Sequence, residues 1–169
     1  GKKVEHILKV KAGLSETLIR RLKRTEGGIL LNGKPAKVIE KVSFGDVVKV
    51  AVTEKSSQNI VPAKIHLDII YEDEDILAVN KPRSMPTHPS KGHRDDTLAN
   101  GVIYYLGQNS RFHVITRLDR DTSGVVLIAK NPVSAAFLTD EMKNGRIAKE
   151  YVAVLNGVLN PQKGIIKAP

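Results

Sequence analysis

The chain has 169 residues, contains no cysteine, and carries a formal net charge of +9. The lack of cysteine excludes disulfides and thiolate chemistry in this sequence and fits a reducing compartment. No apolar run approaches the roughly 20 residues that span a bilayer, so we expect a cytoplasmic protein without membrane contact.

The positive charge is concentrated in the first third of the chain. Residues 1–60 contain 13 Lys and Arg against 6 Asp and Glu, a net charge of +7. Residues 61–169 contain 14 against 12, a net charge of +2. A basic surface of this density favours a polyanionic partner, and nucleic acid fits better than lipid. A basic surface that only aids solubility is the alternative.

The first elements predict a small α+β module. A weak alternation over 4–11 predicts a strand. Ser15 is a suitable N-cap for a helix over 16–25, with Leu18, Ile19 and Leu22 on one side. The other side is basic, and we expect it to bind RNA phosphates together with a lysine of the next hairpin: Arg20, Arg21, Lys23, Arg24 and Lys34.

Glycine, asparagine and proline residues delimit the next elements. Strands are predicted over 29–31 and 34–38, joined by an Asn32-Gly33 turn, and over 47–52. A polar, unpatterned stretch follows. We therefore predict a first domain over 1–55, a linker over 56–62, and a second domain over 63–169.

The second domain is predicted to be a mixed, mainly antiparallel sheet with flanking helices. Strands are expected over 67–71 and 76–79, followed by a long loop over 81–96. Helices are expected from Thr97, as an N-cap, and from Pro132 to about Gly145. Alternating residues over 147–155 predict a last strand, in which Tyr151 shares a face with Ala153 and Leu155.

The segment 113–130 is the most informative part of the sequence. Two apolar, strand-like runs flank a polar loop that contains two arginines, two aspartates and a Thr-Ser-Gly turn. A carboxylate beside arginines, on a loop held by two strands, can both meet a polyanion and perform chemistry on it. A surface turn stabilised by ion pairs is the simpler alternative.

Short motifs in a fixed order extend this observation over the second domain. They are Asn80-Lys81-Pro82, His88-Pro89, Arg117-Leu118-Asp119 with Thr122-Ser123-Gly124, and Lys149-Glu150-Tyr151 with Gly157. In this order they resemble the RluA-type pseudouridine synthases. The N-terminal part resembles the S-four-type RNA-binding domain, named after a ribosomal protein, which often precedes that catalytic domain.

The resemblance implies isomerisation of uridine to pseudouridine in ribosomal or transfer RNA, a reaction that needs no cofactor. Nothing in the sequence suggests an obligate dimer, so we expect a monomer. It places the catalytic carboxylate at Asp119. Arg117 is implied to support extrusion of the target nucleotide, and Tyr151 to stack on its base. Lys81 either meets a phosphate or serves structure. The histidines and aspartates of 88–96 match no common metal-binding spacing, so we expect no metal.

The sequence departs from the family pattern at three points. Ser84 stands where the family usually has glycine, and Thr116 where it usually has histidine. A later basic motif, which supplies a positive partner for the carboxylate, is not found before Pro169, so we expect a C-terminally truncated chain. A non-catalytic RNA-binding or ribosome-assembly factor is therefore the alternative function, and an RNA or nucleoside hydrolase using Asp119 is a third.

Overall fold

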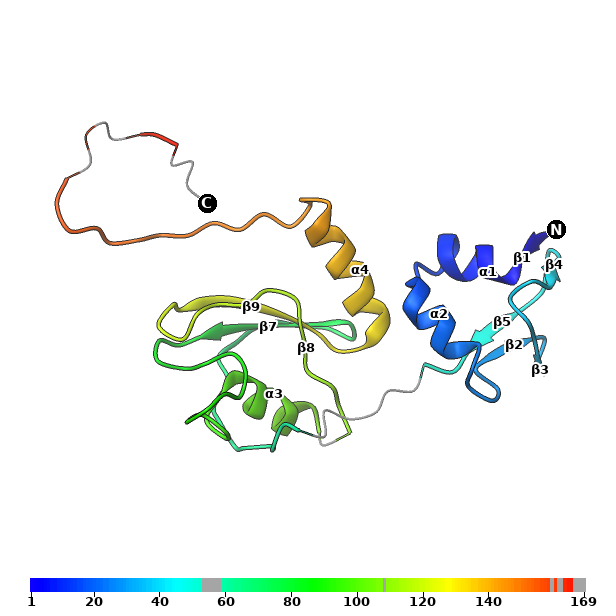
Figure 1. Ribbon diagram of the computed structural model, residues 1–169, viewed down its shortest axis with the longest axis horizontal. Coiled ribbons are helices and arrows are strands. Elements are labelled where there is room, and N and C mark those ends of the chain that lie inside the picture. The colour runs from blue at the N-terminus through cyan, green and yellow to red at the C-terminus, as the bar shows by residue number, and fades with distance from the viewer. Residues whose placement is uncertain (53–58, 108, 159, 161–162, 166–169) are drawn as a thin grey trace.

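The computed structural model describes residues 1–52, 59–107, 109–158, 160 and 163–165 (Figure 1). It has a mixed α+β architecture in which every pair of neighbouring strands among these residues is antiparallel. Residues 56–58 of the predicted linker lie outside the described residues. No helix within the described ranges has the length and apolar character needed to cross a bilayer.

The N-terminal part contains two small sheets and short helices. Strand β1 (Lys2–Lys3) pairs with β4 (Lys41–Val42), and β2 (Ile29–Leu31) lies between β3 (Lys34–Pro35) and β5 (Val48–Val50). The strand predicted over 4–11 is wrong. Those residues form a short helix α1 (Val4–His6) that continues as a π-helical segment η1 (Ile7–Lys11).

Helix α2 (Glu16–Leu22) confirms the predicted helix, although it is shorter. The side chain of Ser15 caps it by accepting a hydrogen bond from the Leu18 amide. Its apolar side packs into a cluster formed by the following buried residues: Val4, Leu8, Leu14, Leu18, Ile19, Leu22, Ile29 and Val38. Burial of this side leaves the basic residues of the helix at the surface.

The Asn32-Gly33 turn between β2 and β3 is confirmed. Asn32 and Gly33 have φ values of 51° and 81°, the left-handed conformation that a two-residue hairpin turn needs. The Asn32 amide also donates to Asp46 at 2.8 Å and accepts from the Val47 amide at 2.9 Å. These side-chain bonds connect the hairpin tip to the start of β5.

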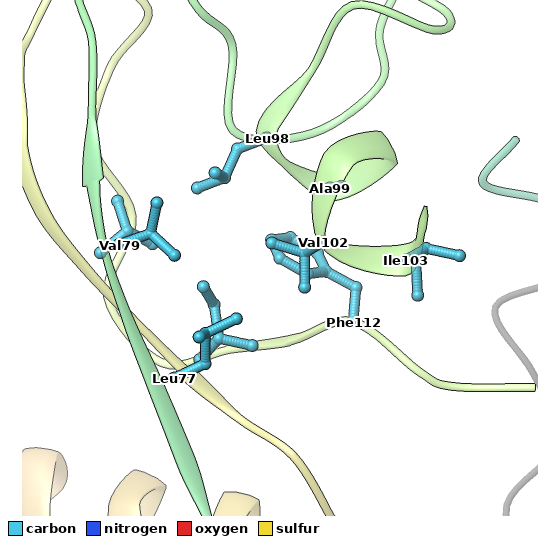
Figure 2. Packing of buried hydrophobic residues seen from close by; sticks show 9 residues of the cluster. Leu77, Val79, Leu98, Ala99, Val102, Ile103 and Phe112 are labelled. Carbon is cyan, nitrogen blue, oxygen red and sulfur yellow. The ribbon is translucent and has the colours of Figure 1, made fainter. Parts of the chain in front are cut away.

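The second part of the chain is built on a four-stranded sheet in the order β6-β7-β9-β8. Its bounds are β6 (Ile69–Glu72), β7 (Ile76–Lys81), β8 (His113–Val114) and β9 (Gly124–Ala129). Helix α3 (Leu98–Leu106) packs on one face, and α4 (Pro132–Lys143) lies on the opposite side of the sheet (Figures 1 and 2). The predicted cap Thr97 and the residue before Pro132, Asn131, both accept hydrogen bonds from the first turns of these helices.

The core of this part lies between the sheet and α3. Figure 2 shows Leu77 and Val79 of β7 on one side of this core, facing Val102 of α3 and Phe112. Val126 and Ile128 of β9 complete the strand side, and both are fully buried. This packing fixes β7 and β9 beside each other, and so fixes the loops that leave their ends.

The strand predicted over 147–155 is wrong. Residues 148–155 form an extended segment without strand pairing (Figure 1), and Tyr151 is 60% exposed. Alternation of apolar residues produces a strand only where a neighbouring strand supplies hydrogen bonds. No described strand pairs with this segment.

Candidate active site

The charged loop 115–123 connects β8 to the start of β9. Gly124, the first residue of β9, pairs with Lys81, the last residue of β7. The long loop that follows Lys81 therefore starts beside the charged loop. Two segments that are far apart in the sequence, 82–89 and 115–123, meet at one end of the sheet.

Lys81 fastens these two segments together. Its side chain is fully buried, and its ammonium donates to the carbonyl oxygens of Pro82 at 3.0 Å, Met85 at 2.8 Å and Arg120 at 3.0 Å. A lysine ammonium has three donors, so all of them are used. Burial lowers the pKa of Lys81, while the negative charges of Asp121 and Asp119 act in the opposite direction.

These contacts correct the RNA-binding role predicted for Lys81. A fully buried ammonium with three carbonyl partners has no donor left for a phosphate. Of the two alternatives that the sequence left open, the contacts support the structural one. Lys81 also places a positive charge close enough to Asp119 and Asp121 for them to influence its pKa.

Two threonines hold the rest of the loop. The buried hydroxyl of Thr87 donates to the Leu118 carbonyl at 2.7 Å. The Thr116 hydroxyl accepts from the Leu127 amide of β9 at 2.9 Å. Thr116, one of the departures from the family pattern, thus binds the sheet, while the Leu118 side chain packs against the core.

The charged side chains of the loop all point to the surface. Asp121 accepts two bonds from Arg120, from Nη2 at 3.0 Å and from Nε at 3.3 Å. These bonds hold the pKa of the Asp121 carboxyl below its usual range, and the charges of Arg120, Arg83 and Lys81 add to the effect. Asp119 is exposed, and its side chain has no ion pair or hydrogen bond within the described residues.

Arg117 is exposed beside His88 rather than paired with either aspartate. Desolvation of the His88 ring, which stands edge-on to Phe112 with centroids 4.9 Å apart, lowers the pKa of His88. The charge of Arg117 lowers it further. The ion pair with Asp119 or Asp121, considered as the structural alternative for Arg117, is not formed among the described residues.

A hollow of about 860 Å³ lies between the loop and the extended segment 148–154. Its lining includes Asp121 and Leu118 on one side, Lys149 and Tyr151 on the other, and Arg83 of the preceding turn. The structure thus brings Tyr151 next to the charged loop, as the site prediction requires. Asp119 and Arg117 stand outside the lining residues.

The other predicted RNA-binding residues lie on the N-terminal part. Arg20, Arg21, Lys23, Arg24 and Lys34 are all exposed. Arg20 and Lys23 line a second hollow, of about 680 Å³, together with three lysines that the sequence analysis did not single out: Lys2, Lys3 and Lys9. These lysines come close to α2 because β1 pairs with β4 and the chain turns after η1. A strand over 4–11, as predicted, would not bring them together.

Arg83 and Thr87 also belong to the site, although no sequence motif contains them. The only available signal was their position between the Lys-Pro and His-Pro motifs. The structure offers no evident metal ligands, because within the described ranges no three His, Asp or Glu side chains gather in one place. His93 pairs instead with Asp96, with 2.7 Å between Nδ1 and Oδ2.

Comparison with known proteins identifies the family. The sequence model of the RNA pseudouridylate synthase family matches residues 75–169, more than half of the chain. The chain therefore belongs to this family. The match includes the charged loop, Tyr151 and all of β7.

Curated relatives agree with this assignment. The chain is 35% identical over 150 residues to an uncharacterized RNA pseudouridine synthase of Bacillus subtilis, YlyB, covering 85% of this chain and 50% of that protein. It is 36% identical over 133 residues to the ribosomal large subunit pseudouridine synthase D of Escherichia coli K12, and this match covers 76% of this chain and 41% of that protein. The chain spans about half the length of the curated relatives it matches.

A solved structure is also similar over part of the chain. Human RNA Pseudouridylate Synthase Domain Containing 1 is 29% identical, with a TM-score of 0.39, and the match covers 48% of this chain and 29% of that one.

Proposed function

We propose that this chain isomerises uridine to pseudouridine in RNA, with Asp119 as the catalytic carboxylate. The observation that carries the proposal is the loop Arg117-Leu118-Asp119, which lies inside the family match and is braced by buried contacts beside a hollow that contains Tyr151. The name of the Escherichia coli relative refers to the large ribosomal subunit, so the RNA of that subunit is the first substrate to test.

The reaction breaks the bond between the ribose and nitrogen 1 of uracil and forms a bond from the ribose to carbon 5. Carbon 5 loses its hydrogen, and nitrogen 1 gains a proton, so no electrons are exchanged. An ionised carboxylate serves this reaction as a nucleophile or as a proton acceptor. The proposal therefore requires no redox cofactor.

The surrounding residues supply the remaining functions. Arg117 is exposed and has no ion pair within the described part of the chain, so its guanidinium is available to stack in the space left by the extruded uridine or to bind a phosphate. The half-exposed ring of Tyr151 is available to stack on the base within the hollow. We assign the positive charge needed near the carboxylate to Lys81, which sits under the loop.

We further propose that residues 1–55 form an S-four-type RNA-binding domain and that the synthase domain covers 63–169. The N-terminal part has its own hydrophobic cluster, distinct from the one beneath α3. Its exposed basic residues would bind phosphates, and such contacts weaken as the salt concentration rises. On single strands, each contact contributes about −0.7 to the slope of log binding constant against log salt concentration. We propose a monomer that acts in the cytoplasm.

One observation favours a chain that binds RNA without modifying it. Asp119 lies outside the residues that line the hollow, whereas Asp121 lies among them. A protein that only binds RNA does not need a catalytic carboxylate in the hollow, so the position of Asp119 would not impair its function.

Tritium release from RNA labelled at carbon 5 of uridine distinguishes these functions, because the new carbon bond expels that hydrogen. We expect release by the native chain and none by Asp119→Asn. Asp95→Asn, the same change on an exposed loop, should release tritium at the native rate. Loss of release in Asp121→Asn alone would transfer the catalytic role to Asp121. No release by any form, despite RNA binding, would favour the binding protein.

A further inference from the structure

Arg83 occupies a turn that is fixed on both sides. It follows Pro82 and precedes Ser84, whose φ is 63°. The buried Lys81 ammonium binds the carbonyls of Pro82 and Met85, which flank this turn. The backbone that carries Arg83 is therefore held in place, although the side chain itself is at the surface.

The Arg83 side chain lines the hollow beside the charged loop. The charge of Arg83 helps to lower the pKa of Asp121, but that carboxylate already receives two hydrogen bonds from Arg120. Within the described residues Arg83 forms no ion pair. Lys149, on the other wall of the hollow, has none in that part of the chain either.

The hollow thus presents two cations that form no ion pair within the described residues. They stand beside the carboxylates of Asp121 and Glu150 and an apolar wall that includes Leu118 and Val125. Its volume of about 860 Å³ falls within the range of about 300–1,000 Å³ that is common for ligand pockets. An apolar wall suits a base and a sugar, and each nucleotide also carries one phosphate. A guanidinium with free donors binds a phosphate through paired hydrogen bonds.

We propose that Arg83 binds a phosphate adjacent to the target uridine, and so orients the nucleotide in the hollow beside the charged loop. This inference rests on the proposed function for the identity of the nucleotide. Arg83 is a substrate-binding residue in this proposal, separate from Asp119, which acts on the base or sugar.

A binding experiment tests the proposal on the full chain. The probe is an RNA octanucleotide with one uridine among adenosines, compared with the same RNA carrying uncharged methylphosphonate linkages on both sides of the uridine. The variants are Arg83→Gln, Arg83→Lys, and Arg94→Gln as a matched control on an exposed loop. Affinity is measured by fluorescence anisotropy at several salt concentrations.

We expect Arg83→Gln to weaken binding of the native RNA by about tenfold, the usual size for one charged hydrogen-bonded contact. For this variant, the negative slope of log binding constant against log salt concentration should become shallower by about 0.7. Arg83→Gln should leave binding of the methylphosphonate RNA unchanged, Arg83→Lys should bind with intermediate affinity, and Arg94→Gln should bind as the native chain does. An equal loss on both RNAs would overturn the proposal, because the contact would not be to those phosphates.

A second comparison separates substrate binding from a structural role. If Arg83 acts only by balancing the charge of Asp121, its effect should vanish in an Asp121→Asn background. We expect the tenfold effect to persist there. Because affinity is the readout, the result stands whether or not the chain releases tritium. Failure of tritium release with a persistent Arg83 effect would overturn the proposed catalysis and leave the phosphate contact intact.

Discussion

The two walls of the hollow are held in opposite ways. The loop 115–123 is held by hydrogen bonds to Lys81, Thr87 and the Leu127 amide of β9. The segment 148–154 has no strand partner among the described residues, and Val152 and Val154 are 96% and 99% exposed. The loop 115–123 is therefore positioned by buried polar contacts. The segment 148–154 supplies side chains to the hollow but none to the hydrophobic core.

This difference indicates where substitutions should affect stability and where they should affect only the site. Changes beneath the loop should alter the free energy of unfolding and activity together. Changes on the extended segment should alter activity alone. Three substitutions test this contrast, in order of decreasing effect on stability.

Lys81→Met should have the largest effect. Methionine retains the length of the side chain but leaves three carbonyl oxygens without their donor. The loss of a buried, charged hydrogen-bonding group should lower the free energy of unfolding by about 3 kcal/mol. Urea unfolding measures the change, and tritium release should fall in parallel because the loop loses its anchor.

Lys91→Met provides the matched control, since Lys91 is exposed on the neighbouring loop. Its free energy of unfolding should stay within about 0.5 kcal/mol of the native value. If the two variants were equally stable, the loop would not depend on Lys81 and the contrast between the walls would fail.

Ser84→Gly should have a smaller effect of the opposite sign. Ser84 has a φ of 63°, which costs an L-residue about 1–2 kcal/mol, whereas glycine adopts it without strain. The greater freedom of glycine in the unfolded chain offsets about 0.5–1 kcal/mol of this gain. We expect a net stabilisation of about 0.5–1 kcal/mol, measured by urea unfolding.

Ser90→Gly is the corresponding control, because Ser90 is not among the residues with positive φ. There glycine should destabilise the chain by about 0.5 kcal/mol through its unfolded-state entropy. A stabilisation at Ser90 equal to that at Ser84 would show that backbone strain is not the cause.

Local signals predicted much of this fold. The caps Ser15 and Thr97, the helix start at Pro132 and the Asn32-Gly33 turn all lie where their side-chain chemistry placed them. These features depend on a few neighbouring residues. Sequence alone could therefore specify them before any tertiary contact was known.

The N-terminal error has a local cause as well. Val4, Ile7 and Leu8 are spaced at i, i+3 and i+4, which is the helical spacing, and Val4 and Leu8 are buried on one side. Interpreting this spacing as weak alternation produced the incorrect strand. The helical period was present in the sequence.

The remaining errors depend on tertiary structure. The burial of Lys81 results from a loop 39 residues away, which supplies the Arg120 carbonyl. The alternation around Tyr151 would give a strand only with a partner beside it. For the candidate site, the sequence indicated the charged loop and Tyr151, but neither the position of Arg83 nor the distance of Asp119 from the hollow follows from residue spacing.

Tyr151→Ala should have the smallest effect on stability. The side chain is 60% exposed, so its removal should change the free energy of unfolding by no more than about 0.5 kcal/mol. If the ring stacks on the target base, tritium release should nevertheless fall by about tenfold, because base stacking on an aromatic residue contributes about 1–3 kcal/mol. Tyr151→Phe keeps the ring and should retain the release rate if stacking alone matters. A fall in stability as large as that of Lys81→Met would contradict the contrast, since it would show that the extended segment is anchored as firmly as the loop. A native rate of tritium release in Tyr151→Ala would show that Tyr151 does not act in the site. The role proposed for the loop 115–123 would be unaffected.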